Sequence, residues 1–544
     1  KGQYLRTSII DLMPDPVRPL YATLGLSAIN QGLQGLMKDI FGAPSGTLPD
    51  ETMMTINGYA YMDAGYTPKQ ILLLIRYMVP KFGRLLRTGV RYWQEEMHPA
   101  YVETADRWEE ADVSSLAPSE LLVGVREVVE EASQHLGSLM VSTMGPSAGA
   151  EALFTNVYEK LVRKKGDPPA PALLLGFDNI PLEAEKTLYD LAQWTKTQPA
   201  LASYLAATPT EAVIGQVEVE APPAEVAADL WIAWCRRFQA YLHDYGYAIY
   251  YLDFTRQLPM DDPVPAIEAL KLYITGQGRS PYERQQAFET RRETALASIR
   301  ARIKGLRAWA FEKTLTWAQR QVPLREDGIA EIGRGYPVLR DMLRELGRRF
   351  MDAGALVSPE DIFWMEIAEV EAGVAALEAG RPPDGLVAVV EERKAQWRAQ
   401  KRVTPPPMLP PKSKYMGIDV SAFTPEEGNV EGTGVIKGLG ASPGRVTAPA
   451  RVLHGPEDFD QMQAGDVLVA SMTTPAWTPL FAMAAGVVTD IGGPLSHGSI
   501  VAREYGIPAV MGTGSATKLI HSGQTVTVVG DTGEVLLGNG NAYP

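Results

Sequence analysis

A proline-rich segment divides this chain of 544 residues into two parts of different character, and it restricts the fold more than any other feature. Five of the seven residues 405–411 are proline, which fixes φ and favours an extended, semi-rigid spacer. Apolar residues before it recur mostly at helical spacing, whereas short β-branched runs follow it. We predict a mostly α-helical domain over residues 1–400, a linker over 401–430 and a small α/β domain over 431–544, and we expect residues 404–412 of the linker to be extended with few contacts to either domain.

The two predicted domains differ in the periodicity of their apolar residues. Residues 282–321 predict one or two long amphipathic helices, and residues 337–350 predict another. Beyond the linker, the β-branched runs predict strands at residues 467–470, 486–490 and 525–529. The fold class expected from these patterns is therefore a multidomain protein in which a helical region precedes an α/β region.

Composition excludes several classes of protein. A net charge of −14 argues against a nucleic-acid partner, which would favour a basic surface. The single cysteine, Cys235, lies in an apolar helical pattern and suits a buried role in the reducing cytoplasm. No apolar run approaches the ~20 residues that span a bilayer, and no secretory signal opens the chain, so we expect a cytoplasmic protein without a membrane partner. Because residue 1 is Lys rather than Met, we expect a fragment or a processed chain.

The strongest candidate for chemistry is His497. Gly492 and Gly493 allow the backbone to approach a bulky anion, Ser496 is a good N-cap, and Gly506 predicts the end of a short helix. The first turn of a helix favours negative charge, so an imidazole placed there suits a phosphohistidine. The alternative interpretation is a capping or packing histidine in an ordinary strand-to-helix turn.

The string around His497, with segments 438–446, 473–480 and 530–535, resembles the swivelling phosphohistidine domain of the phosphoenolpyruvate-utilising enzymes. This family includes phosphoenolpyruvate synthase and rifampin phosphotransferase, and the similarity covers residues 432–537. The resemblance implies that His497 carries a phosphoryl group and that the linker lets its domain swing. The residues implied to form the phosphate cradle are Ser496, which stands where the family usually has Thr, and Gly492, Gly493, Thr473 and Thr474.

Segments 8–20 and 324–327 resemble the acceptor-binding domain of the same family, and this implies that Arg325 and Glu326 lie near the phosphoryl acceptor. An Arg fork suits a phosphate in transfer, and a carboxylate can accept a hydroxyl proton. A surface Arg–Glu pair is the alternative interpretation. Asp11 is a weaker candidate, and His243 is a candidate substitute base where residues 243–253 depart from the family pattern.

The chain also departs from the family at Ile329, where a lysine is usual, and a lost cation weakens the stabilisation of a transferring phosphoryl group. The acceptor chemistry therefore need not match that of rifampin phosphotransferase. Aromatic and methionine residues within 59–97 predict either the wall of a site for a large apolar molecule or ordinary helix core.

These observations favour an enzyme, a dikinase-like phosphotransferase of this family. The resemblance implies transfer from ATP through His497 to a small-molecule acceptor, such as the hydroxyl of a rifamycin-like molecule, with a role in antibiotic resistance. ATP and Mg²⁺ would be bound by an ATP-grasp domain that is not in this chain, in cis or in trans, and no metal site is predicted here. The alternatives are an ATP-dependent ligase resembling prodigiosin synthase and a non-catalytic binding module.

Overall fold

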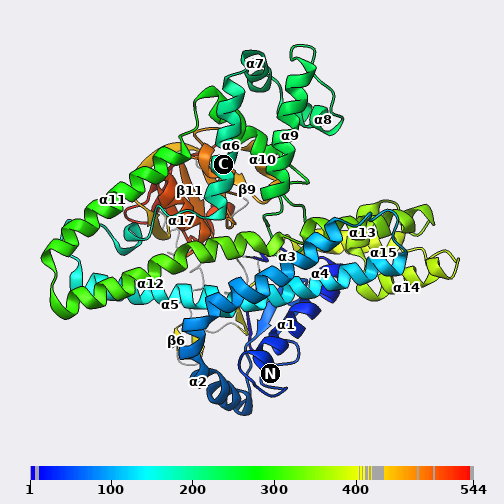
Figure 1. Ribbon diagram of the computed structural model, residues 1–544, viewed down its shortest axis with the longest axis horizontal. Coiled ribbons are helices and arrows are strands. Elements are labelled where there is room, and N and C mark those ends of the chain that lie inside the picture. The colour runs from blue at the N-terminus through cyan, green and yellow to red at the C-terminus, as the bar shows by residue number, and fades with distance from the viewer. Residues whose placement is uncertain are drawn as a thin grey trace. The chain divides into compact units, whose positions relative to one another are not determined.

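The computed structural model describes residues 2–6, 12–403, 405–406, 408–410, 414–415, 418–419, 434–474, 477–493 and 496–538. Its contacts divide the chain into two units, each assembled from several segments. Unit 1 comprises residues 1–146, 251–257 and 331–420, and unit 2 comprises residues 147–250, 258–330 and 421–544. The expected fold class is confirmed, since helices dominate and a small α/β sheet lies near the C-terminal end of the sequence (Figure 1). The division into domains at residues 400 and 430 stays a prediction.

Unit 1 is a helical assembly with a small antiparallel sheet. Its helices are α1 (Leu26–Asp39), α2 (Pro68–Tyr92), α3 (His98–Glu109), α4 (Pro118–Leu139), α13 (Tyr336–Asp352), α14 (Ile367–Glu378) and α15 (Val387–Gln400). The sheet has the order β2 (Met53–Ile56), β3 (Tyr59–Asp63), β1 (Tyr4–Leu5) and β4 (Met408–Leu409), and β5 (Lys414–Tyr415) pairs separately with β6 (Ile418–Asp419). Helix α13 bears out the prediction for residues 337–350, with Leu339, Leu343 and Leu346 fully buried.

The expectation that residues 404–412 make few contacts is wrong for Pro406, Met408 and Leu409. Strand β4 pairs with β1, with Leu409 opposite Tyr4 and Met408 opposite Leu5, and Met408 is buried. The hydroxyl of Tyr61 also donates a hydrogen bond of 2.8 Å to the carbonyl of Pro406. Proline carbonyls still accept hydrogen bonds, and the non-proline residues at 408 and 409 can join a sheet edge. Most of the predicted linker, including residues 404, 407, 411–413 and 420–430, lies outside the described residues.

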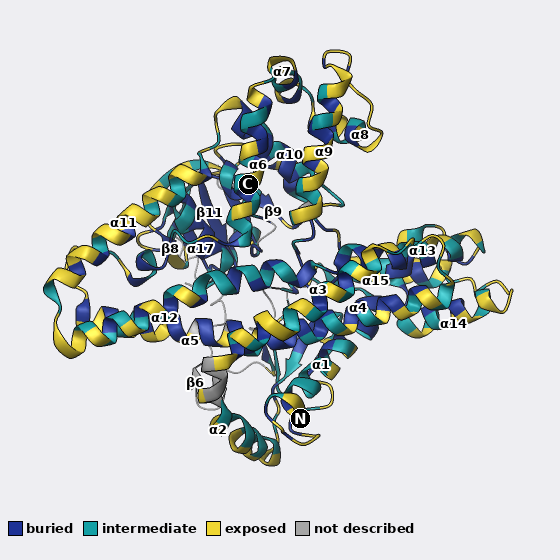
Figure 2. Cartoon of the chain, viewed as in Figure 1, coloured by how far each residue is buried: buried dark blue, intermediate teal, exposed yellow. Residues whose placement is uncertain are grey.

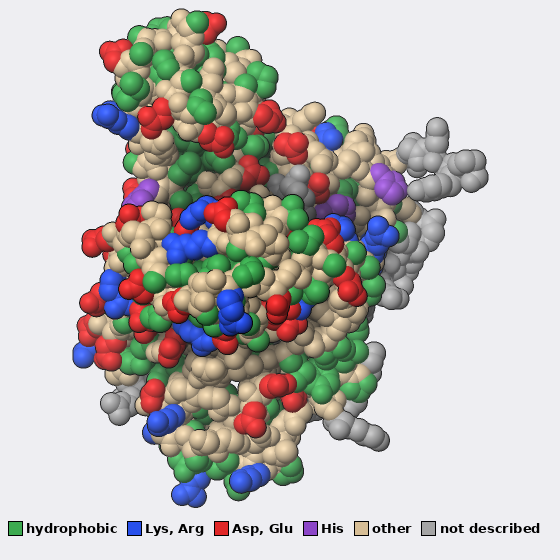
Figure 3. All heavy atoms as spheres, turned by 90° about the vertical axis from the view of Figure 1, so that its right-hand side faces the viewer, with side chains coloured by type: hydrophobic (Ala, Val, Ile, Leu, Met, Phe, Trp, Pro, Cys, Tyr) green, Lys and Arg blue, Asp and Glu red, His purple; other side chains and the backbone are tan. Residues whose placement is uncertain are grey.

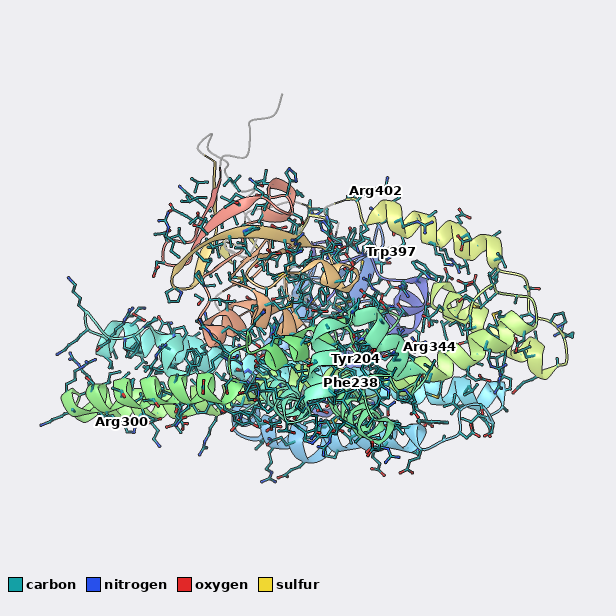
Figure 4. All side chains as sticks on the ribbon, turned by 90° about the horizontal axis from the view of Figure 1, so that it is seen from above. Tyr204, Phe238, Arg300, Arg344, Trp397 and Arg402 are labelled. Carbon is teal, nitrogen blue, oxygen red and sulfur yellow. The ribbon has the colours of Figure 1, made fainter. Side chains whose placement is uncertain are left out.

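The helical part of unit 2 has two separate apolar cores. In the first, α5 (Gly145–Val157) packs against the hairpin of α11 (Pro281–Arg302) and α12 (Gly305–Ala330) through Phe154, Ile299 and Phe311 (Figure 1). Across this hairpin Arg300 donates to Glu312 at 2.8 Å (Figure 4). The prediction of one or two long helices over 282–321 is confirmed as two helices, although α12 runs on through Arg325 and Glu326.

The second core joins five shorter helices of unit 2. They are α6 (Ile180–Lys196), α7 (Pro199–Ala207), α8 (Thr210–Glu218), α9 (Ala228–Tyr245) and α10 (Val264–Thr275). Fully buried Trp231, Trp234 and Phe238 form its centre, with Tyr204 of α7 against Trp231 (Figure 4). Cys235 lies in the same core, as predicted, and burial raises the pKa of its thiol to about 11.

The rest of unit 2 is an eight-stranded sheet flanked by short helices. Its order is β7 (Val435–Lys437), β14 (Glu534–Leu537), β13 (Thr525–Val529), β9 (Arg445–Leu453), β10 (Val467–Ala470), β11 (Gly486–Thr489), β12 (Ala509–Met511) and β8 (Leu439–Ser442). Strands β9 to β12 are parallel, and α16 (Thr478–Met483), α17 (His497–Tyr505) and α18 (Ala516–Leu519) lie between strands in the sequence. The three predicted strands are confirmed as β10, β11 and β13. Figure 2 shows β11 and α17 in the buried interior.

Surface charge is mixed on the face drawn in Figure 3, where acidic and basic side chains alternate over short distances. Among the described residues, no helix combines the length and the apolar character needed to cross a bilayer.

Candidate functional site

The sheet brings the predicted cradle residues together. Thr473 and Thr474 follow β10, whereas Gly492, Gly493 and His497 follow β11, which is paired in parallel with β10. Carboxyl ends of adjacent parallel strands open at the same edge of a sheet, which is where such folds bind ligands. The contact is tight, because a Cβ built on Gly498 would lie 2.5 Å from the Thr473 hydroxyl. The loop after β10 therefore lies against the first turn of α17.

The backbone before His497 has the form that the sequence predicts. Gly492 has φ of +142°, a conformation open chiefly to glycine, and a Cβ there would lie 3.0 Å from the Ser496 hydroxyl. Ser496 occupies the N-cap position and α17 ends at left-handed Gly506, as expected. The Ser496 hydroxyl, however, donates to the carbonyl of Gly493 at 3.0 Å instead of capping the helix. Pro494 and Leu495 lie outside the described residues.

Polar side chains of the cradle are buried and lack partners among the described residues. The hydroxyls of Thr473 and Thr474 form no hydrogen bond there, although both residues are at least nine-tenths buried. Neither ring nitrogen of His497 has a hydrogen-bond partner in the described part of the chain, and its side chain is only 8 % exposed. Buried polar groups of this kind are normally satisfied, so such a cluster suits a ligand with several acceptor oxygens.

Glu326 of α12 is the residue that faces His497. Its Oε2 lies 3.6 Å from Nδ1 of the imidazole, within ion-pair range but too far for a hydrogen bond. Burial alone would raise the pKa of Glu326, but His497 and Arg325 beside it lower that pKa to about 2. The carboxylate is therefore ionised at neutral pH and favours a proton on Nδ1 of His497, which leaves Nε2 as the nucleophilic nitrogen.

Arg325 stands on the other side of the same carboxylate. Its Nε donates to Oε1 of Glu326 at 3.1 Å, and one terminal nitrogen lies 3.7 Å from Oε2 of Glu151 on α5. All three side chains are buried, and burial raises the pKa of Glu151. The sequence prediction thus named two residues that the fold brings to His497, whereas Glu151 carried no sequence signal of its own.

Helix α17 contributes a second carboxylate that sequence reasoning missed. Glu504 lies seven residues after His497, two helical turns along the same face. Burial, and next the charge of Glu326, raise the pKa of Glu504 to about 7. Arg503 beside it donates to the carbonyl of Ala441 at 3.2 Å, and burial lowers the pKa of its guanidinium to about 10. The seven-residue spacing of His497 and Glu504 in a predicted helix was the sequence signal that could have placed both on one face.

An apolar pocket lies within unit 2. We call it the tyrosine pocket, because six tyrosines line it: Tyr241, Tyr245, Tyr247, Tyr250, Tyr273 and Tyr505. Tyr505 is the last residue of α17, and Ala330, also in the wall, is the last residue of α12. The two helices that carry His497 and Glu326 therefore both end in the pocket wall.

The remaining predicted residues lie apart from this arrangement. His243 is on α9, but its ring is more than half exposed, pairs with Asp244 at 3.0 Å and is not part of the pocket wall. Asp11 lies outside the described residues. The aromatic residues proposed for a ligand wall, such as Tyr59 and Tyr61, are buried in unit 1, so the core interpretation applies to them. Within the described residues, no group of three or more His, Cys, Asp or Glu side chains is arranged to hold a metal ion.

Comparisons with known proteins match both parts of this site. Residues 462–533 match the mobile domain of the PEP-utilising enzymes, and residues 139–326 match the fourth domain of rifampicin phosphotransferase. The first match contains His497 and the second ends at Glu326. Two separate regions of the chain, one with His497 and one with Glu326, are thus similar to domains of the phosphoenolpyruvate-utilising enzymes and of rifampicin phosphotransferase.

Three curated relatives illustrate the range of this similarity. The chain is 28 % identical to a rifampicin phosphotransferase from Streptomyces sp over 79 % of its length and 48 % of the relative. It is 30 % identical to the chondramide synthase of Chondromyces crocatus over 89 % of its length, but over 13 % of that protein. It is also 30 % identical to a prodigiosin synthesizing transferase from Serratia marcescens, over 56 % of this chain and 34 % of that one. The chain spans about half or less of the length of these relatives.

A solution structure of Enzyme I is 17 % identical over 37 % of this chain and 74 % of that one. Its TM-score of 0.15 is too low to bear on the fold.

Proposed function

We propose that this chain is the acceptor-binding and phosphohistidine part of a phosphotransferase, in which His497 passes a phosphoryl group to a small molecule bound in the tyrosine pocket. The observation that carries the proposal is the buried pair of His497 and Glu326, 3.6 Å apart, beside the hydroxyls of Thr473 and Thr474, which have no hydrogen-bond partner among the described residues. A carboxylate at Nδ1 prepares Nε2 to accept a phosphoryl group, and the threonine hydroxyls supply donors for its oxygens.

The transfer step follows from the same geometry. The Nε2–phosphorus bond of phosphorylated His497 breaks as an acceptor hydroxyl oxygen bonds to phosphorus. The hydroxyl proton ends on the vacated Nε2, and the resulting imidazolium is stabilised by Glu326 at Nδ1. Because its pKa is about 2, Glu326 suits the role of an orienting anion better than that of a proton acceptor. Arg325, next to this carboxylate, would balance the charge of the phosphoryl group.

The donor in this proposal is ATP with Mg²⁺, held by an ATP-grasp domain in cis or in trans. The described residues include no metal-binding cluster, so no step of the mechanism runs through a metal held by this chain. A bound nucleotide domain would supply the phosphoryl group to Nε2, and the residues described here would hold the ring, exclude water and direct the onward transfer.

The test is to phosphorylate the chain with phosphoramidate, a small donor that needs no nucleotide site. We expect one acid-labile phosphoryl group, located by peptide mapping at His497. His497→Gln should reduce the label to background, whereas His454→Gln, which changes an exposed histidine of the same domain, should retain it. Equal labelling of the His497 variant and the unchanged chain would refute the proposal.

The ligase alternative is supported by the similarity to the prodigiosin synthesizing transferase, which extends over 56 % of this chain. The two functions differ in their products. Transfer to a hydroxyl leaves a stable phosphorylated acceptor, whereas a ligase uses phosphorylation to activate one substrate and releases free phosphate with a joined product. Mass analysis of the products formed from phosphorylated chain and candidate acceptors therefore separates them.

A further inference from the structure

The tyrosine pocket is mostly apolar, but its few charged lining residues all have the same sign. Its charged lining residues are both acidic, Glu185 on α6 and Asp262 in the loop before α10. No Lys, Arg or His belongs to the described lining. An anionic ligand would lose its hydration there without gaining a cationic partner, and such burial of an unpaired charge is strongly unfavourable.

The two carboxylates differ in how they are held. Glu185 accepts hydrogen bonds from the Tyr273 hydroxyl at 2.7 Å and from Arg284 at 3.0 Å. The Arg284 guanidinium lies over the Tyr505 ring, 3.9 Å from its centre, and is not part of the pocket lining. Asp262 accepts one backbone hydrogen bond of 3.3 Å and forms no ion pair among the described residues. The pair formed by Glu185 is therefore balanced, whereas Asp262 leaves negative charge at the wall.

The aromatic lining reinforces the preference that the carboxylates create. Aromatic rings attract cations where a ring face is open to them, and six tyrosines belong to this lining. Burial raises the pKa of Tyr241, Tyr273 and Tyr505, so their hydroxyls stay neutral. One face of Tyr505 already carries the guanidinium of Arg284. The described lining therefore suits an aromatic ligand and offers no cationic partner to an anion.

The helices also set the length that a ligand must have. Tyr505 lies eight residues after His497 on α17, which corresponds to about 12 Å along the helix axis. Ala330 lies four residues after Glu326 on α12, or about 6 Å. A ligand seated among the tyrosines must therefore extend by roughly two helical turns to present a hydroxyl to His497.

We propose that the acceptor is an elongated aromatic molecule with a basic amine, bound in the tyrosine pocket with the amine toward Asp262, and that carboxylate-bearing molecules are excluded. This inference rests on the proposed function, because it takes the tyrosine pocket as the acceptor site. It assigns Asp262 as the residue that determines charge preference, because Glu185 is already paired with Arg284.

Three matched three-ring probes test the proposal by direct binding to the chain, followed by fluorescence anisotropy: 9-(aminomethyl)anthracene, 9-anthracenemethanol and 9-anthracenecarboxylate. We expect the amine to bind at least about tenfold more tightly than the carboxylate, with the alcohol between them. Asp262→Asn should reduce the ratio of amine to carboxylate affinity to near unity. Glu211→Gln, which removes an exposed carboxylate on α8, should leave the ratio unchanged.

A second variant guards against misfolding. Tyr245→Phe keeps the pocket wall apolar and the charge unchanged, so it should retain the preference for the amine. Preferred binding of the carboxylate, absence of binding by all three probes, or an unchanged ratio in folded Asp262→Asn would overturn the inference. Binding needs no phosphoryl group, so these outcomes are independent of the phosphoramidate test. Amine-selective binding to a chain that fails to phosphorylate His497 would defeat the proposed function alone.

Discussion

Two buried histidines, one in each unit, show how the same side chain can serve packing or chemistry. His135 of α4 is fully buried in unit 1, where the Trp93 indole donates to its Nε2 at 3.0 Å and the Tyr101 ring stacks on it at 5.0 Å. Burial, and next the charge of His98, lower the pKa of His135 to about 3. This ring is neutral, and the nitrogen that would act as a nucleophile is already an acceptor.

His497 of unit 2 differs in its place in the helix and in what its ring nitrogens face. It begins a helix instead of lying within one, a carboxylate faces its Nδ1, and its Nε2 has no hydrogen-bond partner among the described residues. The comparison teaches that burial alone does not distinguish the two roles. The two roles differ in which ring nitrogen has a neighbour. The Trp93 N–H donates to Nε2 of His135, whereas the negative charge of Glu326 lies near Nδ1 of His497.

The largest expected effect contrasts the two histidines in stability. His135→Ala should destabilise the protein by about 3 kcal/mol, because it leaves a cavity and an unsatisfied Trp93 N–H. His497→Ala should cost less, about 1–2 kcal/mol, because it leaves a cavity and removes the partner of Glu326 but loses no hydrogen bond among the described residues. Urea denaturation followed by circular dichroism measures both. Equal losses would remove the distinction between the packing and the chemical histidine.

A smaller effect should appear when the charge beside His497 is removed. Glu326→Gln should slow phosphoryl transfer by about 10²-fold, because Nδ1 loses the anion that favours its proton. Glu151→Gln is the matched control, since it removes a carboxylate from Arg325 without touching His497, and should change the rate little. Nitrogen NMR of the His497 ring supplies a second readout. A tautomer unchanged in Glu326→Gln would contradict the orienting role.

The smallest expected effect concerns the pH dependence of stability. The folded-state pKa of Glu504 is about 7 against an ordinary 4.5, so its neutral form is favoured by folding. Its contribution is complete below about pH 4.5 and is lost as the pH rises through 7. Glu504→Gln should therefore be more stable than the unchanged protein near pH 8, with little difference near pH 4. Urea titrations at both pH values measure the free energy of unfolding, with Glu211→Gln as the control. The same gain in stability for Glu504→Gln at pH 4 and pH 8 would contradict the prediction.

Local sequence patterns predicted the elements around His497 but not its partners. The runs at 467–470, 486–490 and 525–529 became strands because β-branched residues bounded by turn formers have few alternatives. Gly506 ended α17 for an equally local reason, its left-handed backbone. The approach of Glu326 to His497 joins distant segments, and only the family resemblance indicated it.

The tyrosine pocket could not be predicted from composition. Its wall takes residues from α6, α9, α10 and α17, which are far apart in the sequence. Tyrosines pack against neighbours in a core and line a cavity with equal ease, so the sequence could offer residues 59–97 only as either a ligand wall or helix core and gave no sign of this pocket. The contacts of the linker with β1 were missed for a related reason, since proline content predicts an extended backbone but not what that backbone pairs with.

Helix α17 has a consequence for any attempt to re-engineer this protein. It is one rod of nine residues, with the proposed phosphoryl carrier at its first position and a wall residue of the pocket at its last. Because both residues belong to one short helix, a substitution at Tyr505 that moves the helix also moves His497, and a shift of about 1 Å at the reacting atom is enough to slow transfer by about 10²-fold. Selectivity and turnover are thus mechanically linked, and a library that varies Tyr505 alone samples both at once.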